Sequence, residues 1–304
     1  MSNQLSVYHP IVKSRCLWLI SLFTLMGASS GYATATGFKQ KLDVQIRADE
    51  QTSRDVRYQY RVRYYPQFSF SDTWSINGFA VTGDDYGSSH NTLDDDSADY
   101  FYARRVYVRH EGEYGKTEVG IIPTYKGRVS SSGLSKDGWI KGLRHVRTLG
   151  DDKFEVVFGQ LSSLDPADAL NRPDDLNYVE VEYSALINDS WSYEISAERM
   201  TSSNFVRTEL RYSYSPRMSY FCELVSRVDS SKIKAVLGVE GGVSLKQYEM
   251  EYFVHYSYVS DNFGLRAELT EDFLGTGHGF SAELGGDFTH TKLGWFLRYD
   301  AVDS

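Results

Sequence analysis

Residues 56–64 alternate between two kinds of side chain, and this alternation constrains the fold more than any other feature of the sequence. One parity holds only valine and tyrosine, and the other holds only arginine and glutamine. The two sets are Val56, Tyr58, Tyr60, Val62 and Tyr64 against Arg57, Gln59, Arg61 and Arg63. A period of two is that of a β-strand, whereas a helix would spread the arginines over all of its faces. The segment therefore predicts a strand with one apolar face and one wet face.

Two-faced segments of this kind recur along the chain, for example at 41–48 and 248–258, and they predict an all-β fold. Period-two runs bounded by turn residues give sixteen strands, at 38–48, 56–66, 73–83, 100–111, 116–123, 138–147, 152–160, 177–186, 190–200, 204–214, 218–227, 232–241, 245–259, 263–271, 279–289 and 292–301. Most have about 9 to 11 residues, the length that a tilted strand needs to cross a bilayer. An even count is usual for bacterial barrels. We expect a closed antiparallel transmembrane β-barrel of about 16 strands.

Residues 1–35 have the pattern of a secretory signal peptide. Lys13 and Arg15 precede the apolar run 16–26, and small residues that end in Ala33 and Ala35 follow it. A membrane anchor is the alternative, but the run is well short of the roughly 20 residues of a spanning helix. We expect cleavage after one of the two alanines, so that residues 36–304 form a single barrel domain.

Loop lengths predict two different ends for this barrel. In the first half, the long polar connections 84–99, 124–137 and 161–176 alternate with short ones. A barrel has long loops outside the cell and tight turns in the periplasm. The mean hydropathy of −0.41 is compatible with a barrel, because lipid-facing and water-facing residues cancel in the average.

Motifs for catalysis or metal binding are missing from the sequence. It contains no HExxH, GxSxG, CxxC or phosphate-binding glycine loop. The neighbours Ser88, Ser89, His90 and Asn91 lie too close together in one loop to form a nucleophile and base pair. The aspartates at 84–85 and 94–96 could offer oxygen ligands to Ca²⁺, but their spacing fits no EF-hand, and a solvated loop is the simpler interpretation. We expect no enzyme, no metal and no cofactor.

The segment 104–128, RRVYVRHEGEYGKTEVGIIPTYKGR, resembles the Gram-negative outer-membrane porins. In that family, a strand with Arg and Tyr, a G-x-[FY]-G turn and a G-x-x-x-x-G strand lead towards the loop that folds into the pore. The matching residues are Arg105, Tyr107, Arg109, Gly112, Tyr114, Gly115 and Gly120. The glycines permit the tight turn, while Val106 and Val108 face outward.

The resemblance implies a passive channel for small hydrophilic solutes, with residues 124–137 as the constricting loop. The expected pore-lining residues are Arg57, Arg61, Arg63, Arg105, Tyr107 and Arg109. The resemblance also implies outer-membrane lipid and lipopolysaccharide as surroundings, ion transport, no nucleic-acid partner, and a homotrimer as an allowed assembly. The alternatives are a structural or adhesive barrel without conductance and a secreted soluble β-sandwich that binds a ligand.

Charges on the inward parity predict two opposed walls. The early strands carry arginine and lysine, and the later strands carry glutamate: Glu180, Glu182, Glu194, Glu198, Glu209, Glu223, Glu249, Glu251, Glu268 and Glu283. Opposed walls across a narrow pore would create a transverse field. The arginines predict a weak preference for anions at the constriction, which the carboxylates oppose. The alternative interpretation is that these charges pair locally on solvated faces.

Overall fold

The computed structural model describes residues 15–27, 37–52, 54–93, 99–124, 133–161, 164–245, 248–288 and 291–303, and all of its strands belong to one sheet. The strands are β1 (Arg15–Gly27), β2 (Gly37–Gln51), β3 (Arg54–Ser69), β4 (Trp74–Thr82), β5 (Asn91–Thr92), β6 (Phe101–Gly112), β7 (Gly115–Pro123), β8 (Trp139–Leu149), β9 (Asp152–Gln160), β10 (Tyr178–Leu186), β11 (Trp191–Met200), β12 (Ser203–Ser215), β13 (Met218–Arg227), β14 (Lys232–Leu245), β15 (Tyr248–Val259), β16 (Gly277–Asp287) and β17 (Leu293–Asp303). Two short helices complete the elements, η1 (Pro166–Asp168) and α1 (Leu265–Glu268). The expected all-β class is confirmed.

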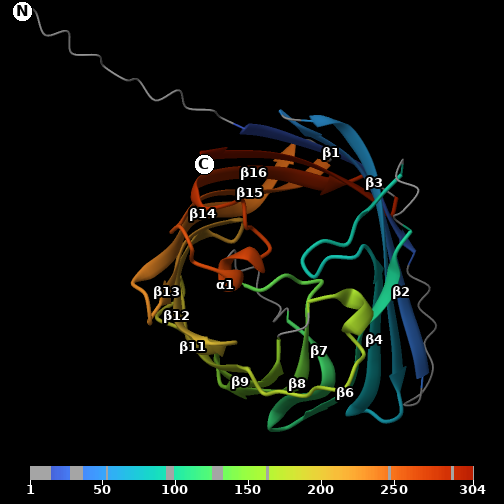
Figure 1. Ribbon diagram of the computed structural model, residues 1–304, viewed down its shortest axis with the longest axis vertical. Coiled ribbons are helices and arrows are strands. Elements are labelled where there is room, and N and C mark those ends of the chain that lie inside the picture. The colour runs from blue at the N-terminus through green and yellow to red at the C-terminus, as the bar shows by residue number, and fades with distance from the viewer. Residues whose placement is uncertain are drawn as a thin grey trace, which may run out of the picture.

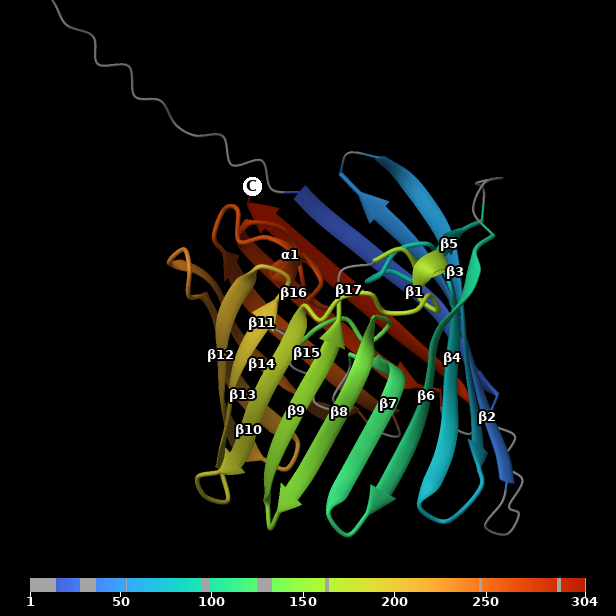
Figure 2. The ribbon, with the colours of Figure 1, turned by 60° about the horizontal axis from the view of Figure 1, so that its bottom comes forward.

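Each long strand from β2 to β17 pairs antiparallel with the next long strand along the chain. The two-residue strand β5 adds to the edge of β3. Figure 1 shows the sheet curving around a central space into which α1 and several connections fold. Figure 2 shows tight hairpins at one end and the longer connections at the other. Hereafter these are the turn end and the loop end.

Alternation along the strands sorts the side chains as expected. In β3, Tyr58 is 52% exposed on the outer face, whereas Gln59 and Arg63 are buried on the inner one. In β6, Val106 is exposed while Arg105 and Tyr107 are buried. The outer face is therefore apolar and the inner face is polar, the inverse of a water-soluble protein.

Exposed aromatic side chains gather at the turn end of the outer face. Trp74, Trp191 and Tyr248 begin β4, β11 and β15, and Tyr114 lies in the β6–β7 hairpin. Tyrosine and tryptophan prefer the boundary between lipid and water, so this arrangement resembles one aromatic girdle of a membrane barrel. Among the described residues, no helix is long and apolar enough to span a membrane.

The glycines of the 104–128 motif are required by the backbone. Gly115 and Gly120 have φ values of 113° and 126°, a region that other residues rarely adopt. A Cβ atom at Gly115 would collide with the carbonyl of Val146, and one at Gly120 would collide with that of Val106. The motif thus fixes the β6–β7 hairpin and its contact with β8.

One predicted strand is wrong. Residues 263–271 form α1 and a loop inside the curve of the sheet instead of a strand. Their alternating apolar side chains suggested a strand, but the same spacing places Phe263, Ala267 and Leu269 in a buried interior core. Glu268, expected on an inward strand face, lies in α1.

The predicted signal peptide falls partly outside the described residues. Residues 1–14 and 28–36 are not described, while 15–27 forms β1, which pairs antiparallel with both β17 and β2. Strands β2 and β17 consequently run in the same direction. These pairings leave cleavage of the segment a prediction.

Candidate functional site

A cavity of about 1770 Å³ lies inside the curve of the sheet. Its lining starts at the turn end, with Glu113, Asp151 and Arg217, and reaches inward to Leu134 and Arg266. The side chains come from β6 to β17 and from the connections that fold inward. A polar cavity of this size can hold many water molecules and a small solute.

Carboxylates outnumber basic side chains two to one in the lining of this cavity. The lining carboxylates are Glu111, Glu113, Asp151, Glu155, Glu180, Glu182, Glu194, Glu240, Glu249, Glu251, Glu271, Asp272, Glu283 and Asp287. The lining bases are Lys116, Lys136, Lys153, Arg207, Arg217, Arg266 and Arg298. A cleft lined by one sign of charge raises the local concentration of the opposite ion. The lining therefore favours cations near its surface.

The three arginines expected from β3 lie on the inner face, as the alternation predicts, but not in the lining of this cavity. Arg57 pairs with Asp49 at 2.7 Å, and Arg63 pairs with Asp137 at 2.8 Å. Arg61 has a buried Nε atom that, among the described residues, has no hydrogen-bond partner. Their role as pore-lining residues stays a prediction.

The three expected residues of β6 are engaged with neighbouring segments, and they too lie outside the cavity lining. The Nε of Arg105 donates to the carbonyl of Gly138 at 2.8 Å. Tyr107 belongs to the interior core, and Arg109 pairs with Glu118 at 2.8 Å while donating to the hydroxyl of Tyr107. These contacts fit the alternative interpretation, in which the inward charges pair locally.

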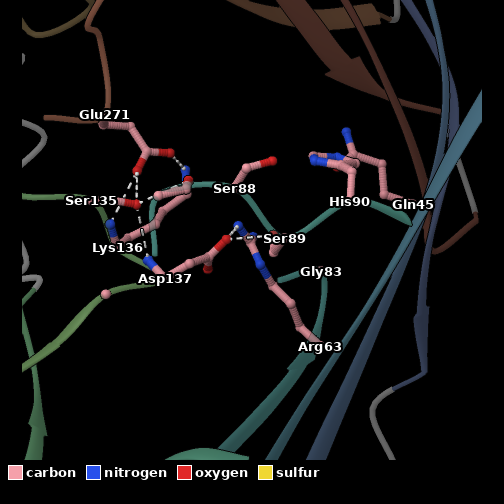
Figure 3. A network of polar contacts seen from close by, with 12 residues as sticks. Gln45, Arg63, Gly83, Ser88, Ser89, His90, Ser135, Lys136, Asp137 and Glu271 are labelled. Atoms are coloured by element: carbon pink, nitrogen blue, oxygen red, sulfur yellow. Dashed lines mark hydrogen bonds and ion pairs between the residues drawn. The ribbon is translucent and has the colours of Figure 1, made fainter. Parts of the chain in front are cut away.

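Asp137, in the connection between β7 and β8, contacts both Arg63 of β3 and Ser89 in the connection between β4 and β6 (Figure 3). Its carboxylate accepts hydrogen bonds from Arg63 at 2.8 Å and from the hydroxyl of Ser89 at 2.5 Å. Burial alone would raise the pKa of this carboxyl, but the charges of Arg63 and Arg61 hold it well below its usual range. Asp137 is therefore ionised and offsets the charge of Arg63.

His90 joins the same region to β2. Its Nε2 lies 3.2 Å from Oε1 of Gln45 (Figure 3). Burial, followed by the charge of Arg47, lowers the pKa of His90 far below its usual value. The imidazole is consequently neutral at pH 7 and adds no charge to the wall.

Two segments that are far apart in sequence meet inside the sheet, and we call residues 133–138 and 260–276 together the crossbar. The amide of Ser135 donates to the carbonyl of Leu269 at 2.8 Å, and Leu134 and Thr270 form an isolated β-bridge. Lys136 pairs with Glu271 at 3.0 Å. Of the predicted constricting loop 124–137, Thr124 and 133–137 are described, and the latter do fold inward.

Ion pairs fasten the crossbar to the later strands. Arg266 pairs with Glu198 of β11 at 2.8 Å, and both side chains are buried. Lys234 of β14 pairs with Asp272 at 2.8 Å and donates to the hydroxyl of Thr270 at 2.6 Å. Such pairs are costly to break once water has been excluded from them.

An apolar core fills the interior towards the loop end. Its members come from strand ends and from four connections: Tyr86, Tyr107, Ile122, Leu134, Trp139, Ile140, Val157, Leu161, Ala169, Tyr178, Met200, Phe205, Val225, Val259, Phe263, Ala267 and Leu269. The ring of Tyr86 packs at a tilt against that of Trp139, with their centroids 4.6 Å apart, and its hydroxyl donates to the carbonyl of Trp139. Interior space at the loop end is thus packed, while the cavity occupies the space towards the turn end.

Glutamates of the later strands lie directly opposite one another. Glu194 of β11 faces Glu209 of β12, which faces Glu223 of β13, and all three are buried. Arg207 pairs with Glu194, with Glu182 and, at 3.5 Å, with Glu180. Like charges at directly opposed positions destabilise a sheet. Arg207 offsets the charge of Glu194, and Arg211, which pairs with Glu209 at 2.9 Å, offsets that of Glu209.

Sequence reasoning found the charged walls but missed segment 260–276. The signals available were the turn residues Ser260 to Asn262, a glycine at 264, and an arginine within an apolar run. None of them identifies Glu198, the partner of that arginine, which lies 68 residues away.

No protein-family model matches this sequence, and no curated protein matches it either. Solved structures do. A variant of the porin from Rhodopseudomonas blastica superposes with a TM-score of 0.51 at 6% identity, over 96% of this chain and 99% of that one. OprB of Pseudomonas putida superposes with a TM-score of 0.53 at 8% identity, over 95% and 93%. The chain therefore has a porin-like fold, that of proteins of the bacterial outer membrane.

Proposed function

We propose that this protein is a passive channel for small hydrophilic solutes across the outer membrane of a Gram-negative bacterium. The observation that carries the proposal is the polar cavity of about 1770 Å³ inside a sheet whose outer face is apolar. Water and ions need a polar path, and lipid needs an apolar surface, so this distribution suits a membrane channel.

The proposal includes a closed barrel. The pairing of β1 with both β17 and β2, and of the long strands from β2 to β17 in succession, supports this part of the proposal. An unpaired strand edge is not tolerated in hydrocarbon. The strand lengths of 9 to 16 residues also suit a tilted crossing of the bilayer.

The proposal places the solute path along both charged walls. We retain Arg57, Arg61, Arg63, Arg105 and Arg109, with Tyr107, as candidate residues of its narrow part. The carboxylates of the cavity lining form the wider part at the turn end. Passive passage requires no catalysis and no cofactor.

A barrel without conductance is the second candidate, and one observation favours it. The apolar core packs the interior at the loop end with residues from four connections. The soluble β-sandwich is not supported, because the strands form a single sheet instead of two packed sheets.

Residues 1–35 remain our proposal for the signal peptide, and a homotrimer for the assembly. Cleavage after Ala33 or Ala35 would remove β1, which joins β2 to β17, so a closed mature barrel would need a direct contact between these two strands, which run in the same direction. Intact-mass measurement of protein purified from outer membranes decides this. Recovery of a chain that still contains residues 15–27 would show that β1 belongs to the mature wall.

Liposome swelling tests the function. Protein reconstituted in lipid vesicles should admit small sugars and amino acids, and the rate should fall as the solute grows. Protein with heat-modifiable gel mobility that never raises the swelling rate above that of empty vesicles would favour the barrel without conductance. Recovery in a soluble fraction would contradict both barrel hypotheses.

A further inference from the structure

We infer that the crossbar limits the size of solute that can pass, and that two latch pairs, Arg266–Glu198 and Lys234–Asp272, hold it across the interior. This inference rests on the proposed function and names the element that regulates it. The sequence pointed to a single constricting loop at 124–137, whereas most of the crossbar comes from segment 260–276.

The crossbar reaches from one wall to the opposite one. On the side of the early strands, Asp137 pairs with Arg63 of β3, and Arg105 of β6 donates to the carbonyls of Gly138 and Lys136. On the other side, the latch pairs join Arg266 to β11 and Asp272 to β14. Figure 1 shows these strands on opposite sides of the ring, with α1 between them.

The two halves of the crossbar are joined into one unit. Backbone hydrogen bonds link Ser135 to Leu269 and Glu271 to Gly133, at 2.8 Å and 3.4 Å. The side chains of Ser135 and Lys136 add contacts to the carboxylate of Glu271 (Figure 3). A unit anchored at both ends and joined in the middle does not swing aside without breaking buried pairs.

The crossbar separates the cavity from the packed loop end. Lys136, Glu271 and Asp272 line the cavity, whereas Phe263, Ala267 and Leu269 belong to the apolar core. A solute that enters at the turn end therefore meets the crossbar before it can reach the loop end.

Replacement of residues 262–273 by a glycine-serine linker of equal length tests this inference. Single-channel conductance in planar bilayers should rise at least two-fold, and vesicles should admit larger sugars than those with the unaltered protein. The matched control replaces 187–190, the hairpin that links β10 and β11 at the turn end, and it should conduct like the unaltered protein.

A milder variant tests the same inference if the linker protein does not fold. The double substitution Lys234→Met with Asp272→Leu removes one latch without leaving a lone buried charge, and it should raise conductance in the same direction. Heat-modifiable mobility confirms folding of every variant.

The outcomes separate the two proposals. Larger conductance in the crossbar variants alone supports the inference. Equal conductance in all folded proteins overturns it and leaves the channel function intact. Absence of conductance from every folded variant overturns the channel function itself.

Discussion

Buried charges are paired in different ways in two regions of the sheet, the wall of arginines on β2 to β6 and the wall of glutamates on β9 to β13. Some arginines of the first wall meet separate carboxylates, as Arg57 meets Asp49 and Arg63 meets Asp137, whereas Arg105 donates to backbone carbonyls. Glutamates of the second wall face one another and share Arg207 among three of them. The arginines of the first wall lie outside the cavity lining, while Glu180, Glu182 and Glu194 of the second wall are part of it. Sequence charge alone therefore does not tell which wall a solute meets.

The largest expected effect is on stability, at Arg207, which three glutamates of the second wall share. Arg207→Met leaves Glu182 and Glu194 without their shared partner and should cost about 3 to 5 kcal/mol of unfolding free energy. Urea unfolding in lipid vesicles measures this. The control Arg217→Met, at an exposed ion pair of the turn end, should change the unfolding free energy by less than about 1 kcal/mol. Equal losses at the two sites would mean that Arg207 is not the hub of the wall.

The next effect is on ion selectivity. Glu194→Gln with Glu240→Gln removes two carboxylates from the cavity lining and should shift the permeability ratio towards anions. Reversal potentials under a salt gradient report the ratio. The shift should shrink in 1 M salt, where the Debye length is about 3 Å. A ratio that stays constant in a conducting channel would remove these glutamates from the solute path.

A smaller shift of opposite sign is expected from the arginine wall. Arg61→Ser with Arg105→Ser should move the ratio towards cations, but by less than the glutamate pair moves it, because both arginines lie outside the cavity lining. The same reversal-potential measurement compares the two pairs. A larger effect of the arginine pair would place the selective constriction at the first wall, as the sequence alone suggested.

The sequence predicts the faces of the strands but not the path of segment 260–276. Strand faces were predictable because a period of two is a local property, and Val106 and Arg105 lie on the faces expected of them. Segment 260–276 was not predictable. Its apolar alternation fits a strand, and only contacts with distant partners such as Glu198 make it fold inward.

The contact between Asp137 and Arg63 could not be predicted from the sequence either. Asp137 lies 74 residues from Arg63, in a connection whose path depends on docking against Ser89 and segment 260–276. Alternation assigns an arginine to the inner face, but it does not say whether water or a loop covers that arginine. The expected pore-lining residues therefore remain candidates.

The smallest expected effect is the pH dependence of the Asp137 contact. Its pKa is lowered in the folded state, so its contribution is present above the unfolded pKa of about 3.9 and is lost as the pH falls further. Asp137→Asn should thus lower the unfolding free energy at pH 7 and at pH 5 by the same amount, and by less at pH 2. A difference that already vanishes at pH 5 would contradict the ionised contact with Arg63.

Thiol modification during single-channel recording tests most directly whether solutes cross through the interior of the sheet. In a Cys222→Ser background, Glu240→Cys places a thiol on the accessible part of the cavity lining, and Leu237→Cys places one on the exposed outer face of the same strand, β14. A bulky, positively charged, water-soluble thiol reagent should reduce the current of the first variant and leave that of the second unchanged. Current that is equally insensitive, or equally sensitive, to modification at both positions would contradict a conduction path through the cavity.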